Sequence, residues 1–190
     1  METTYTEQYL IQKQLEKDLY FLRLAREVSK SSKCLSRKIG SVLVKDGCII
    51  STGYNGPAKG VKHCDERKYF FYEKLDNKIL AGSFEHQNNY LTVCPRRIFD
   101  YKSGQGLHLC QAGHSERNAI IQAARNGIAT KDTILYAYCA IPCKDCMIEC
   151  INAGIKEIVC LKSDKSYDNY SRIIQEESGI LLREIDSTLL

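Results

Sequence analysis

Apolar residues recur at helical spacing near the start of the chain. Within residues 10–30, glutamine, lysine and glutamate residues separate the members of one apolar stripe, which are Ile11, Leu15, Leu19, Leu22, Ala25 and Val28. Apolar side chains at this spacing share one face of a helix, and burial of that face stabilises the helix. The pattern therefore predicts an amphipathic helix over residues 10–30.

Two β-rich runs follow this helix. Residues 39–44 and 48–52 are rich in valine and isoleucine, and Lys45-Asp46-Gly47 separates them. An Asp-Gly pair between two such runs is a strong signal for a tight turn between antiparallel strands. We therefore expect the sheet to begin with a β-hairpin.

Strand and helix patterns alternate in the second half of the chain. Helices are expected over residues 115–126, 142–152 and 170–177, and strands over residues 133–139, 156–161 and 180–184. Glycines at the ends of the helical patterns support these boundaries. Such alternation is typical of an α/β domain in which helices pack on a sheet with parallel neighbouring strands.

The segment from about residue 65 to residue 112 interrupts this order. It is polar and scattered with aromatic, cysteine and histidine residues, and it lacks a clean period. A chain of 190 residues has the length of one domain with some elaboration. We therefore expect a single domain over residues 1–190 with an insertion at about 65–112.

The composition is that of a packed globular protein. Hydrophobic residues make up 44% of the chain and charged residues 26%, which excludes collagen-like and largely disordered classes. A formal net charge of +4 is too small to indicate a nucleic-acid surface. The sequence has neither a basic-then-apolar leader nor an apolar run of membrane length, so we expect a cytoplasmic protein without membrane contact.

Ten cysteines are the unusual feature of this composition. In a reducing compartment, cysteines serve as metal ligands or core residues more readily than as disulfides. Free cysteine also packs as a small apolar residue. The spacing of the cysteines must therefore distinguish zinc ligands from core residues.

Two short motifs combine metal-binding and acid–base residues. His114-Ser115-Glu116 and Pro142-Cys143-Lys144-Asp145-Cys146 each stand at the start of an expected helix. Either motif alone is weak, because His-x-Glu occurs by chance and Cys-x-x-Cys also fits a zinc knuckle, a redox pair or two core cysteines. Together they match the zinc-deaminase signature, His-x-Glu followed by Pro-Cys-x-x-Cys.

The residue types in these motifs suit a catalytic zinc ion. One neutral histidine (His114) and two thiolates (Cys143 and Cys146) balance the charge of Zn²⁺, so the metal stays a Lewis acid with one open position. The positive end of a helix favours the thiolate forms of both cysteines. Glu116, two residues from the histidine, is expected to serve as the proton shuttle.

The chain resembles the deoxycytidylate (dCMP) deaminases of the cytidine deaminase-like superfamily over roughly residues 15–185. Besides the two motifs, further segments stand in that family's order, namely Ser32-Lys33-Cys34, Ile39-Gly40-Ser41-Val42, Gly53-Tyr54-Asn55-Gly56, Ala124-Arg125-Asn126-Gly127 and Ala153-Gly154-Ile155-Lys156. Ser115 departs from the family, most of whose members carry alanine there. The resemblance implies a three-layer α/β/α fold around a mixed sheet of about five strands.

The resemblance also implies hydrolytic deamination of dCMP to dUMP and ammonia, which supplies dUMP for thymidylate synthesis. In that reaction a zinc-bound hydroxide attacks C4 of the cytosine while Glu116 moves the protons. Two alternatives stay open. One is a deaminase of dCTP or of another cytosine nucleotide, and the other is a non-enzymatic interaction module stabilised by zinc.

Substrate and regulatory residues are suggested with less support from the sequence. By analogy with the family, Asn55 contacts the deoxyribose, and Tyr54 and Gly56 belong to a regulatory nucleotide site. A tight turn with positive φ angles is the simpler reading of Tyr54-Asn55-Gly56. Candidates for the phosphate partner, each of which also fits a solvated surface group, are Arg37, Lys38, Arg125 and Tyr167.

A second, structural zinc is expected in or beside the insertion, because such a segment buries little core and needs a staple. Four cysteines outside regular elements are its expected ligands, Cys34, Cys64, Cys94 and Cys110, with His63 and His108 as substitutes. The family resemblance further implies a homo-oligomer, often a hexamer, which dCTP with Mg²⁺ activates and dTTP inhibits.

Overall fold

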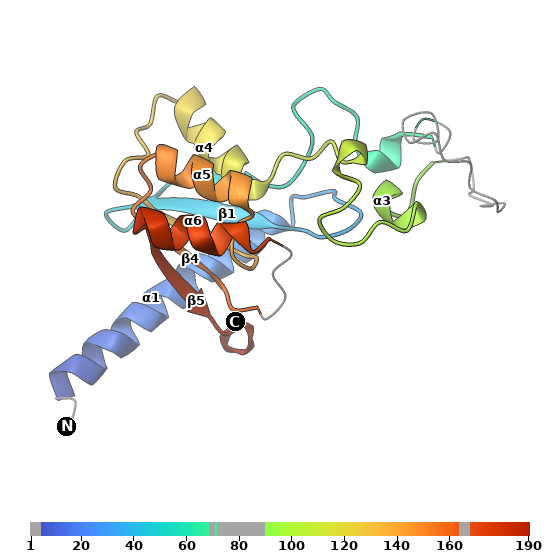
Figure 1. Ribbon diagram of the computed structural model, residues 1–190. Coiled ribbons are helices and arrows are strands. Elements are labelled where there is room, and N and C mark those ends of the chain that lie inside the picture. Colours follow the sequence, from blue (N-terminus) through green and yellow to red (C-terminus); the bar gives the residue numbers. More distant parts are fainter. Residues whose placement is uncertain (1–4, 69–70, 72–89, 164–167) are drawn as a thin grey trace.

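The fold is built on a five-stranded mixed sheet, seen edge-on in the computed structural model of the chain (Figure 1), which describes residues 5–68, 71, 90–163 and 168–190. The strands are β1 (Gly40–Lys45), β2 (Cys48–Tyr54), β3 (Ile134–Ala137), β4 (Glu157–Leu161) and β5 (Leu181–Ile185). Their order is β2-β1-β3-β4-β5. Strand β1 pairs antiparallel with β2 and β3, whereas β3, β4 and β5 run parallel. The predicted mixed sheet is confirmed.

The hairpin predicted at Asp46-Gly47 joins β1 and β2. Both residues have positive φ angles, 50° for Asp46 and 80° for Gly47, as a type I′ turn requires. No side chain is forced into a strained position, since aspartate tolerates this region better than most residues and glycine has no Cβ. The sequence signal for the start of the sheet is therefore confirmed.

Side chains along the central strands alternate between two apolar clusters. In β1, Leu43 faces one cluster while Val42 and Val44 face the other. In β3, Leu135 and Tyr136 divide in the same way. Because successive residues of a strand point to opposite faces, a sheet buried on both faces needs apolar residues at every position. The continuous apolar runs therefore reflect a sheet covered on both sides.

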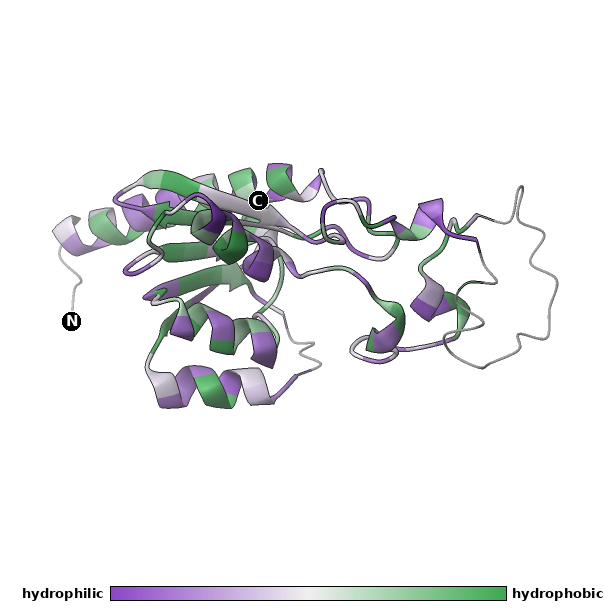
Figure 2. Ribbon diagram, turned by 90° about the horizontal axis from the view of Figure 1, so that it is seen from above, coloured by the Kyte–Doolittle hydropathy of each residue, from purple (hydrophilic) through white to green (hydrophobic). Residues whose placement is uncertain are grey.

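Helices cover both faces, which gives the three layers that the family resemblance implies. Helix α1 (Tyr5–Ser29) packs on one face through Phe21, Leu22 and Ala25. Helices α4 (Ser115–Arg125), α5 (Lys144–Asn152) and α6 (Tyr170–Ser178) lie on the other face. Figure 2, viewed from above, separates α1, the sheet and the α5–α6 pair into three layers. The α/β/α fold class is confirmed.

Helix α1 begins earlier than its amphipathic pattern predicts. Its first turns project beyond the sheet (Figure 1), and residues 6–14 are all exposed. The helical pattern predicted residues 10–14 but not residues 5–9. Ile11, expected in the buried stripe, is 61% exposed, because this part of the helix extends past the sheet and has nothing to pack against. Although α1 is long, no helix of the described residues is both long and apolar enough to cross a membrane.

A buried charged group fastens the second half of α1 to the sheet. Asp18 is 1% exposed, and its Oδ1 accepts a hydrogen bond of 3.1 Å from the hydroxyl of Tyr136 on β3. Arg183 on β5 pairs with Asp18 and with Glu157 on β4. A buried carboxylate needs such partners, since burial without them is costly. The group links α1 to three strands.

The described part of the irregular region beside the sheet includes short helical turns. They are η1 (Cys64–Glu66), α3 (Pro95–Ile98) and η3 (Leu107–Leu109), and one further turn, η4 (Ser187–Leu189), ends the chain. A small cluster of Leu91, Ile98, Phe99 and Leu109 packs this region. In Figures 1 and 2 it extends from one end of the sheet, away from α1's free end. Its described part therefore has a small core of its own.

Candidate active site and metal centre

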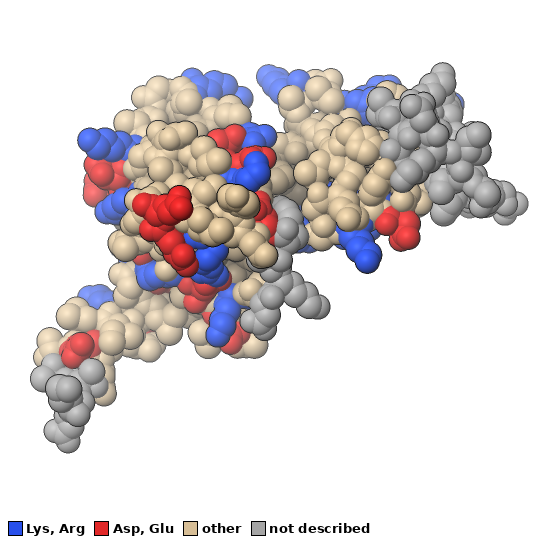
Figure 3. Space-filling model, viewed as in Figure 1, with Lys and Arg blue, Asp and Glu red and all other residues tan. Residues whose placement is uncertain are grey.

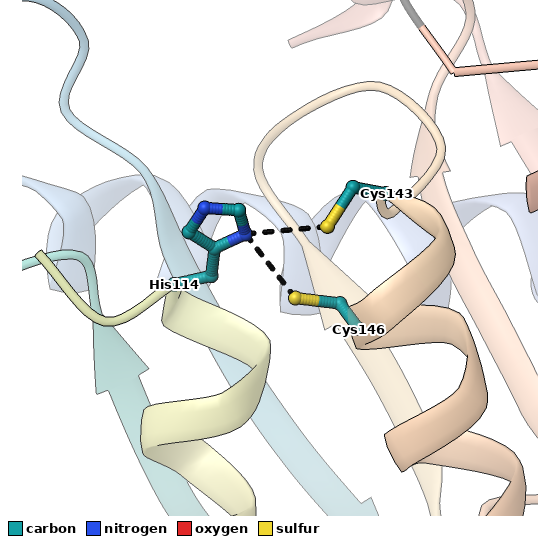
Figure 4. Close-up of side chains that lie close together, drawn as sticks. All are labelled: His114, Cys143 and Cys146. Carbon is teal, nitrogen blue, oxygen red and sulfur yellow. Dashed lines mark hydrogen bonds between the residues drawn. The ribbon is translucent and has the colours of Figure 1, made fainter. Parts of the chain in front are cut away.

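Three potential metal ligands meet where α4 and α5 begin. His114 is the N-cap residue of α4, Cys143 is the N-cap residue of α5, and Cys146 lies in the first turn of α5. Figure 4 shows one ring nitrogen of His114 facing both sulfur atoms. Helix α5 begins at Lys144, so Pro142 precedes the helix and does not open it as the sequence predicted. Both helix N-termini therefore point at one site.

The spacing of these atoms fits a zinc ion. The Nδ1 atom of His114 lies 3.4 Å from Sγ of Cys143 and 3.3 Å from Sγ of Cys146. Tetrahedral zinc with ordinary Zn–N and Zn–S bonds separates its nitrogen and sulfur ligands by about 3.6 Å. Among the described residues, His114, Cys143 and Cys146 form the one group of three or more such ligands within 4.8 Å of one another. The histidine and two thiolates are a donor set typical of zinc.

The electrostatic surroundings favour a thiolate at Cys143. Its pKa is lowered to about 4, because hydrogen bonds from Cys146 and then from His114 stabilise the thiolate. The pKa of Cys146 is raised, because its proton is held in the bond to Cys143 and because it is buried. The pKa of His114 is raised mainly by its hydrogen bond with Cys143. The surroundings thus favour the thiolate form of Cys143, which is the form that binds metals.

Glu116 lies beside these ligands on the first turn of α4. It is 4% exposed, and burial raises the pKa of its carboxyl. Ser115 Oγ donates to Oε2 at 3.0 Å, and Sγ of Cys139 lies 3.9 Å from Oε1. A carboxyl group with a raised pKa can hold a proton as well as accept one near neutral pH. The position and chemistry of Glu116 suit a proton shuttle.

A close approach of α4 to β2 sets the position of the first turn of α4. Gly53 on β2 lies against the backbone of Ser115 and Ala119, and a Cβ atom at residue 53 would overlap both. The hydroxyl of Ser51, on the same strand, donates to the carbonyl of Ala119 at 2.5 Å. The glycine therefore permits a contact that fixes His114 and Glu116 relative to the sheet.

A cavity opens beside His114, Glu116 and Cys143. Apolar side chains of Ile39 and Ile141 contribute to its wall. Its charged lining residues are Glu116, Arg37, Arg96 and Asp168. A partly apolar pocket with a few convergent polar groups is the usual form of a small-molecule site. The two arginines would suit an anionic group on a ligand.

Asn55 lines this cavity, but its amide is engaged with the neighbouring loop. Its Oδ1 accepts from the N–H of Ile39 and its Nδ2 donates to the carbonyl of Arg37, both at 2.8 Å. Neither Asn55 nor Gly56 has a positive φ angle. Gly56 pairs with Gly113 as a β-bridge. The tight-turn reading of Tyr54-Asn55-Gly56 is therefore wrong, because the segment ties β2 to the residue before His114.

The other predicted nucleotide-binding residues do not all lie at the cavity. Arg37 lines the cavity, whereas Lys38 is exposed and does not. Arg125 is exposed at the last residue of α4, about 15 Å along the helix from its first residue. The structure thus does not bring Arg125 to the cavity, because Arg125 lies at the C-terminal end of α4 whereas the cavity lies at its N-terminal end. Tyr167 lies outside the described residues, and Tyr54 is 42% exposed.

Two of the charged cavity residues, Arg96 and Asp168, were not found by sequence reasoning. Arg96 is the second residue of α3 in the irregular region and donates hydrogen bonds to the carbonyls of Gln105 and Lys102. Asp168 accepts from the N–H of Lys144 at 2.6 Å, at the start of α5. Neither belongs to a motif, and only the tertiary fold brings them beside His114.

The expected ligands of a second zinc do not form a comparable group. All six candidates lie within the described residues, yet none belongs to a group of three ligands within 4.8 Å. Cys34 and Cys110 line the cavity, and Cys94 is buried at the start of α3. Cys64 begins η1, directly after His63, while His108 lies in η3 with its ring against Tyr101. The second zinc therefore stays a prediction.

Solved structures share this fold. The crystal structure of the dCMP deaminase from the cyanophage S-TIM5 in complex with dCMP and dUMP aligns with a TM-score of 0.61. The alignment covers 90% of this chain and 97% of that chain, at 18% sequence identity. The likeness defines the chain as a protein of the deaminase fold.

Sequence comparisons then place the chain in a family. The sequence profile of the cytidine and deoxycytidylate deaminase zinc-binding region matches residues 15–162. The deoxycytidylate deaminase of Enterobacteria phage T4 is 34% identical over 164 residues, which are 81% of this chain and 82% of that protein. The chain belongs to the cytidine and deoxycytidylate deaminase family.

A eukaryotic relative is longer. The deoxycytidylate deaminase of Schizosaccharomyces pombe is 29% identical over 167 residues. These residues are 88% of this chain but 43% of that protein. The chain thus corresponds to less than half the length of this relative.

Proposed function

We propose that this protein is a zinc-dependent hydrolase that converts dCMP to dUMP and ammonia, and thereby supplies dUMP for thymidylate synthesis. The observation that carries the proposal is the convergence of His114, Cys143 and Cys146 beside the buried carboxyl of Glu116, on one cavity. Relatives named deoxycytidylate deaminase, and the dCMP and dUMP bound in the cyanophage structure, support dCMP as the substrate.

The proposed mechanism assigns one role to each group. His114, Cys143 and Cys146 would hold the zinc ion, which supplies Lewis acidity and lowers the pKa of water toward neutrality when bound. Glu116 accepts a proton from the attacking water and delivers a proton to the exocyclic amino nitrogen on C4 of the cytosine, which departs as ammonia. Its burial excludes solvent and keeps its pKa high enough to hold that proton.

Substrate recognition is proposed to divide between the walls and the charged groups of the cavity. Arg37 and Arg96 are the positively charged lining residues and would pair with the 5′-phosphate. Asn55 holds the backbone of residues 37–39 and still has one amide N–H and one oxygen lone pair for the sugar. The phosphate contacts would distinguish a nucleotide from a nucleoside.

The proposal is tested with a substrate panel on the zinc-loaded protein. Ammonia release and product formation are measured with dCMP, dCTP, deoxycytidine and a structured RNA. We expect dCMP to have the highest kcat/KM. A preference for dCTP would support the alternative of another cytosine nucleotide, and release of ammonia from none of them would contradict an enzymatic function.

Two variants test the phosphate contacts. Arg37→Ala and Arg96→Ala should raise the KM for dCMP about tenfold or more, while leaving kcat/KM for deoxycytidine little changed. Lys38→Ala is the matched control, because Lys38 is an exposed neighbour that does not line the cavity. Equal effects of all three substitutions on dCMP would exclude a specific phosphate site.

A nucleic-acid substrate is disfavoured by the charge distribution. On the face seen in Figure 3, basic and acidic side chains are interspersed and form no basic stripe. Nucleic-acid binding relies on many phosphate contacts, so this face does not favour it. We infer a small nucleotide as the ligand.

Assembly and regulation are proposed from the family resemblance. The outer helices expose Ile121, Ile148 and Ile173 to 55%, 41% and 43%, which supports coverage by further copies in a homo-oligomer, a hexamer by resemblance. Light scattering tests this. Activation by dCTP with Mg²⁺ and inhibition by dTTP, through Tyr54 and Gly56, are tested by adding each nucleotide to the assay.

Metal content and compartment complete the proposal. A structural zinc in addition to the catalytic one would give two zinc ions per chain, and elemental analysis counts them. None of the ten cysteines, all of which lie within the described residues, forms a disulfide, which supports a reducing, cytoplasmic location.

A further inference from the structure

Two buried serine hydroxyls form a chain that ends at the carboxylate of Glu116. Ser115 Oγ lies 3.0 Å from Oε2 of Glu116 and 2.7 Å from Oγ of Ser41. Both serines are fully buried, with 0% exposure. The chain therefore connects β1, at the interior of the sheet, to the side chain that faces the cavity.

Hydrogen-bonding capacity determines the direction of this chain. A carboxylate only accepts hydrogen bonds, whereas a serine hydroxyl donates one and accepts up to two. Ser115 must donate its hydrogen to Glu116, so the short contact with Ser41 is made by the Ser41 hydroxyl donating to Ser115. Burial excludes water that would compete for these bonds. Ser41 thus holds the hydroxyl of Ser115 in the orientation that Glu116 needs.

The arrangement is specific to Ser41 among the buried serines beneath α4. Ser51 on β2 also reaches α4, but its hydroxyl donates to the carbonyl of Ala119. Ser51 therefore fastens the helix backbone without contacting Glu116. The comparison separates attachment of the helix from orientation of the carboxylate.

The two carboxylate oxygens of Glu116 are held unequally. Oε2 accepts the hydroxyl hydrogen bond from Ser115, whereas Oε1 has the thiol of Cys139 at 3.9 Å. A thiol is a weak donor, and Cys139 lines the cavity together with Glu116. Oε1 is therefore the oxygen that is free to exchange its partner.

We propose that Ser115, anchored by Ser41, positions Glu116 so that Oε2 stays fixed while Oε1 moves the proton. The inference rests on the proposed deaminase function. Neither serine lines the cavity, so both are positioning residues. A fixed Oε2 prevents rotation of the carboxyl group, which keeps Oε1 aimed at the reacting atoms through both proton transfers.

Kinetics of four variants test the proposal. Most family members carry alanine at this position, but in this chain Ser115→Ala removes the donor to Oε2 and the acceptor of the Ser41 hydroxyl. It should lower kcat on dCMP about tenfold with little change in KM, and Ser41→Ala should lower kcat about threefold to fivefold. The double variant should equal Ser115→Ala, because Ser41 acts only through Ser115. Ser29→Ala is the control. Ser29 on α1 is buried, donates its hydroxyl hydrogen to the carbonyl of Arg26 and does not line the cavity, so loss of this hydroxyl should lower thermal stability but not kcat.

Two further readouts exclude a general structural effect. Zinc content should stay at the wild-type level in every variant. A dCMP analogue with a pyrimidin-2-one base, which binds tightly only after addition of water, should bind Ser115→Ala at least tenfold more weakly, while dUMP binds unchanged.

Several outcomes would overturn the proposal. They are an unchanged kcat in Ser115→Ala, independent effects of the two serines in the double variant, or an equal loss of kcat in Ser29→Ala. Inactivity of the wild-type protein on dCMP would instead contradict the proposed function, so the two failures are distinguishable.

Discussion

Arg117 and Glu149 join the two helices that carry the candidate zinc ligands. Nε of Arg117 lies 2.9 Å from Oε2 of Glu149, and Nη2 lies 2.8 Å from Oε1. Arg117 stands next to Glu116 on α4, and Glu149 lies on α5 one turn after Cys146. This two-point contact holds the first turn of α4 against α5.

Loss of this pair should weaken zinc binding moderately. Both side chains are 39% exposed, so solvent screening limits the pair to about 0.5–1 kcal/mol. Glu149→Gln should therefore lower zinc affinity about twofold to fivefold, measured by competition with a chelator. The exchange Arg117→Glu with Glu149→Arg should restore most of the affinity. If the exchanged variant loses as much zinc affinity as Glu149→Gln, the pair does not align the helices.

Two glycines in the hairpin provide a matched test of helix packing. Gly53 lies against the backbone of α4, and Gly40 lies against the backbone of α1 at Ala25 and Ser29. Alanine at either position overlaps a helix backbone, so each substitution should destabilise the fold by about 1–3 kcal/mol. Gly53→Ala should also lower zinc affinity, because it displaces His114, whereas Gly40→Ala should not. Denaturation and chelator competition check this, and equal zinc affinities in both variants would contradict it.

Alkaline conditions should destabilise the fold through Tyr136. Burial first, and then the charge of Asp18, raise the pKa of the Tyr136 phenol. Above pH 10 the unfolded chain loses this proton while the folded chain retains it, so the free energy of unfolding falls as pH rises. The contribution of one such group is about 1.4 kcal/mol per pH unit. Tyr136→Phe should flatten this decline in urea titrations between pH 9 and pH 12, and an unchanged slope would be the contrary result.

The regular part of the fold follows from local patterns. Short β-rich runs, apolar patterns at helical spacing and helix-ending glycines predicted all five strands and the helices packed on them to within a few residues. Residues 5–9 of α1 were missed, because a helix end without a buried face needs no apolar period.

The metal-binding and acid–base residues were also accessible from the sequence. His114 and Glu116, and likewise Cys143 and Cys146, are close in the chain and stand at helix starts. Their local spacing therefore already fixes much of their geometry. This is why motif recognition brought together residues that the structure also brings together.

The remainder of the cavity depends on long-range packing. Arg96 and Asp168 come from separate loops, and no local spacing relates them to His114. Arg125 shows the converse. It belongs to Ala124-Arg125-Asn126-Gly127, a segment that stands in the family's order, yet it lies at the end of α4 opposite to His114. The serine chain could not be predicted either. Ser41 and Ser115 are 74 residues apart in the sequence, and only the packing of α4 on β1 places them side by side.

The central claim is that Glu116 moves protons beside a zinc ion held by His114, Cys143 and Cys146. It is tested most directly by measuring zinc content and dUMP formation from dCMP in the same preparation of Glu116→Gln, which keeps the size of the side chain but removes its acid–base function. We predict wild-type zinc content with kcat lowered about 10²- to 10⁴-fold. Wild-type turnover by this variant, or loss of its zinc together with its activity, would contradict the account.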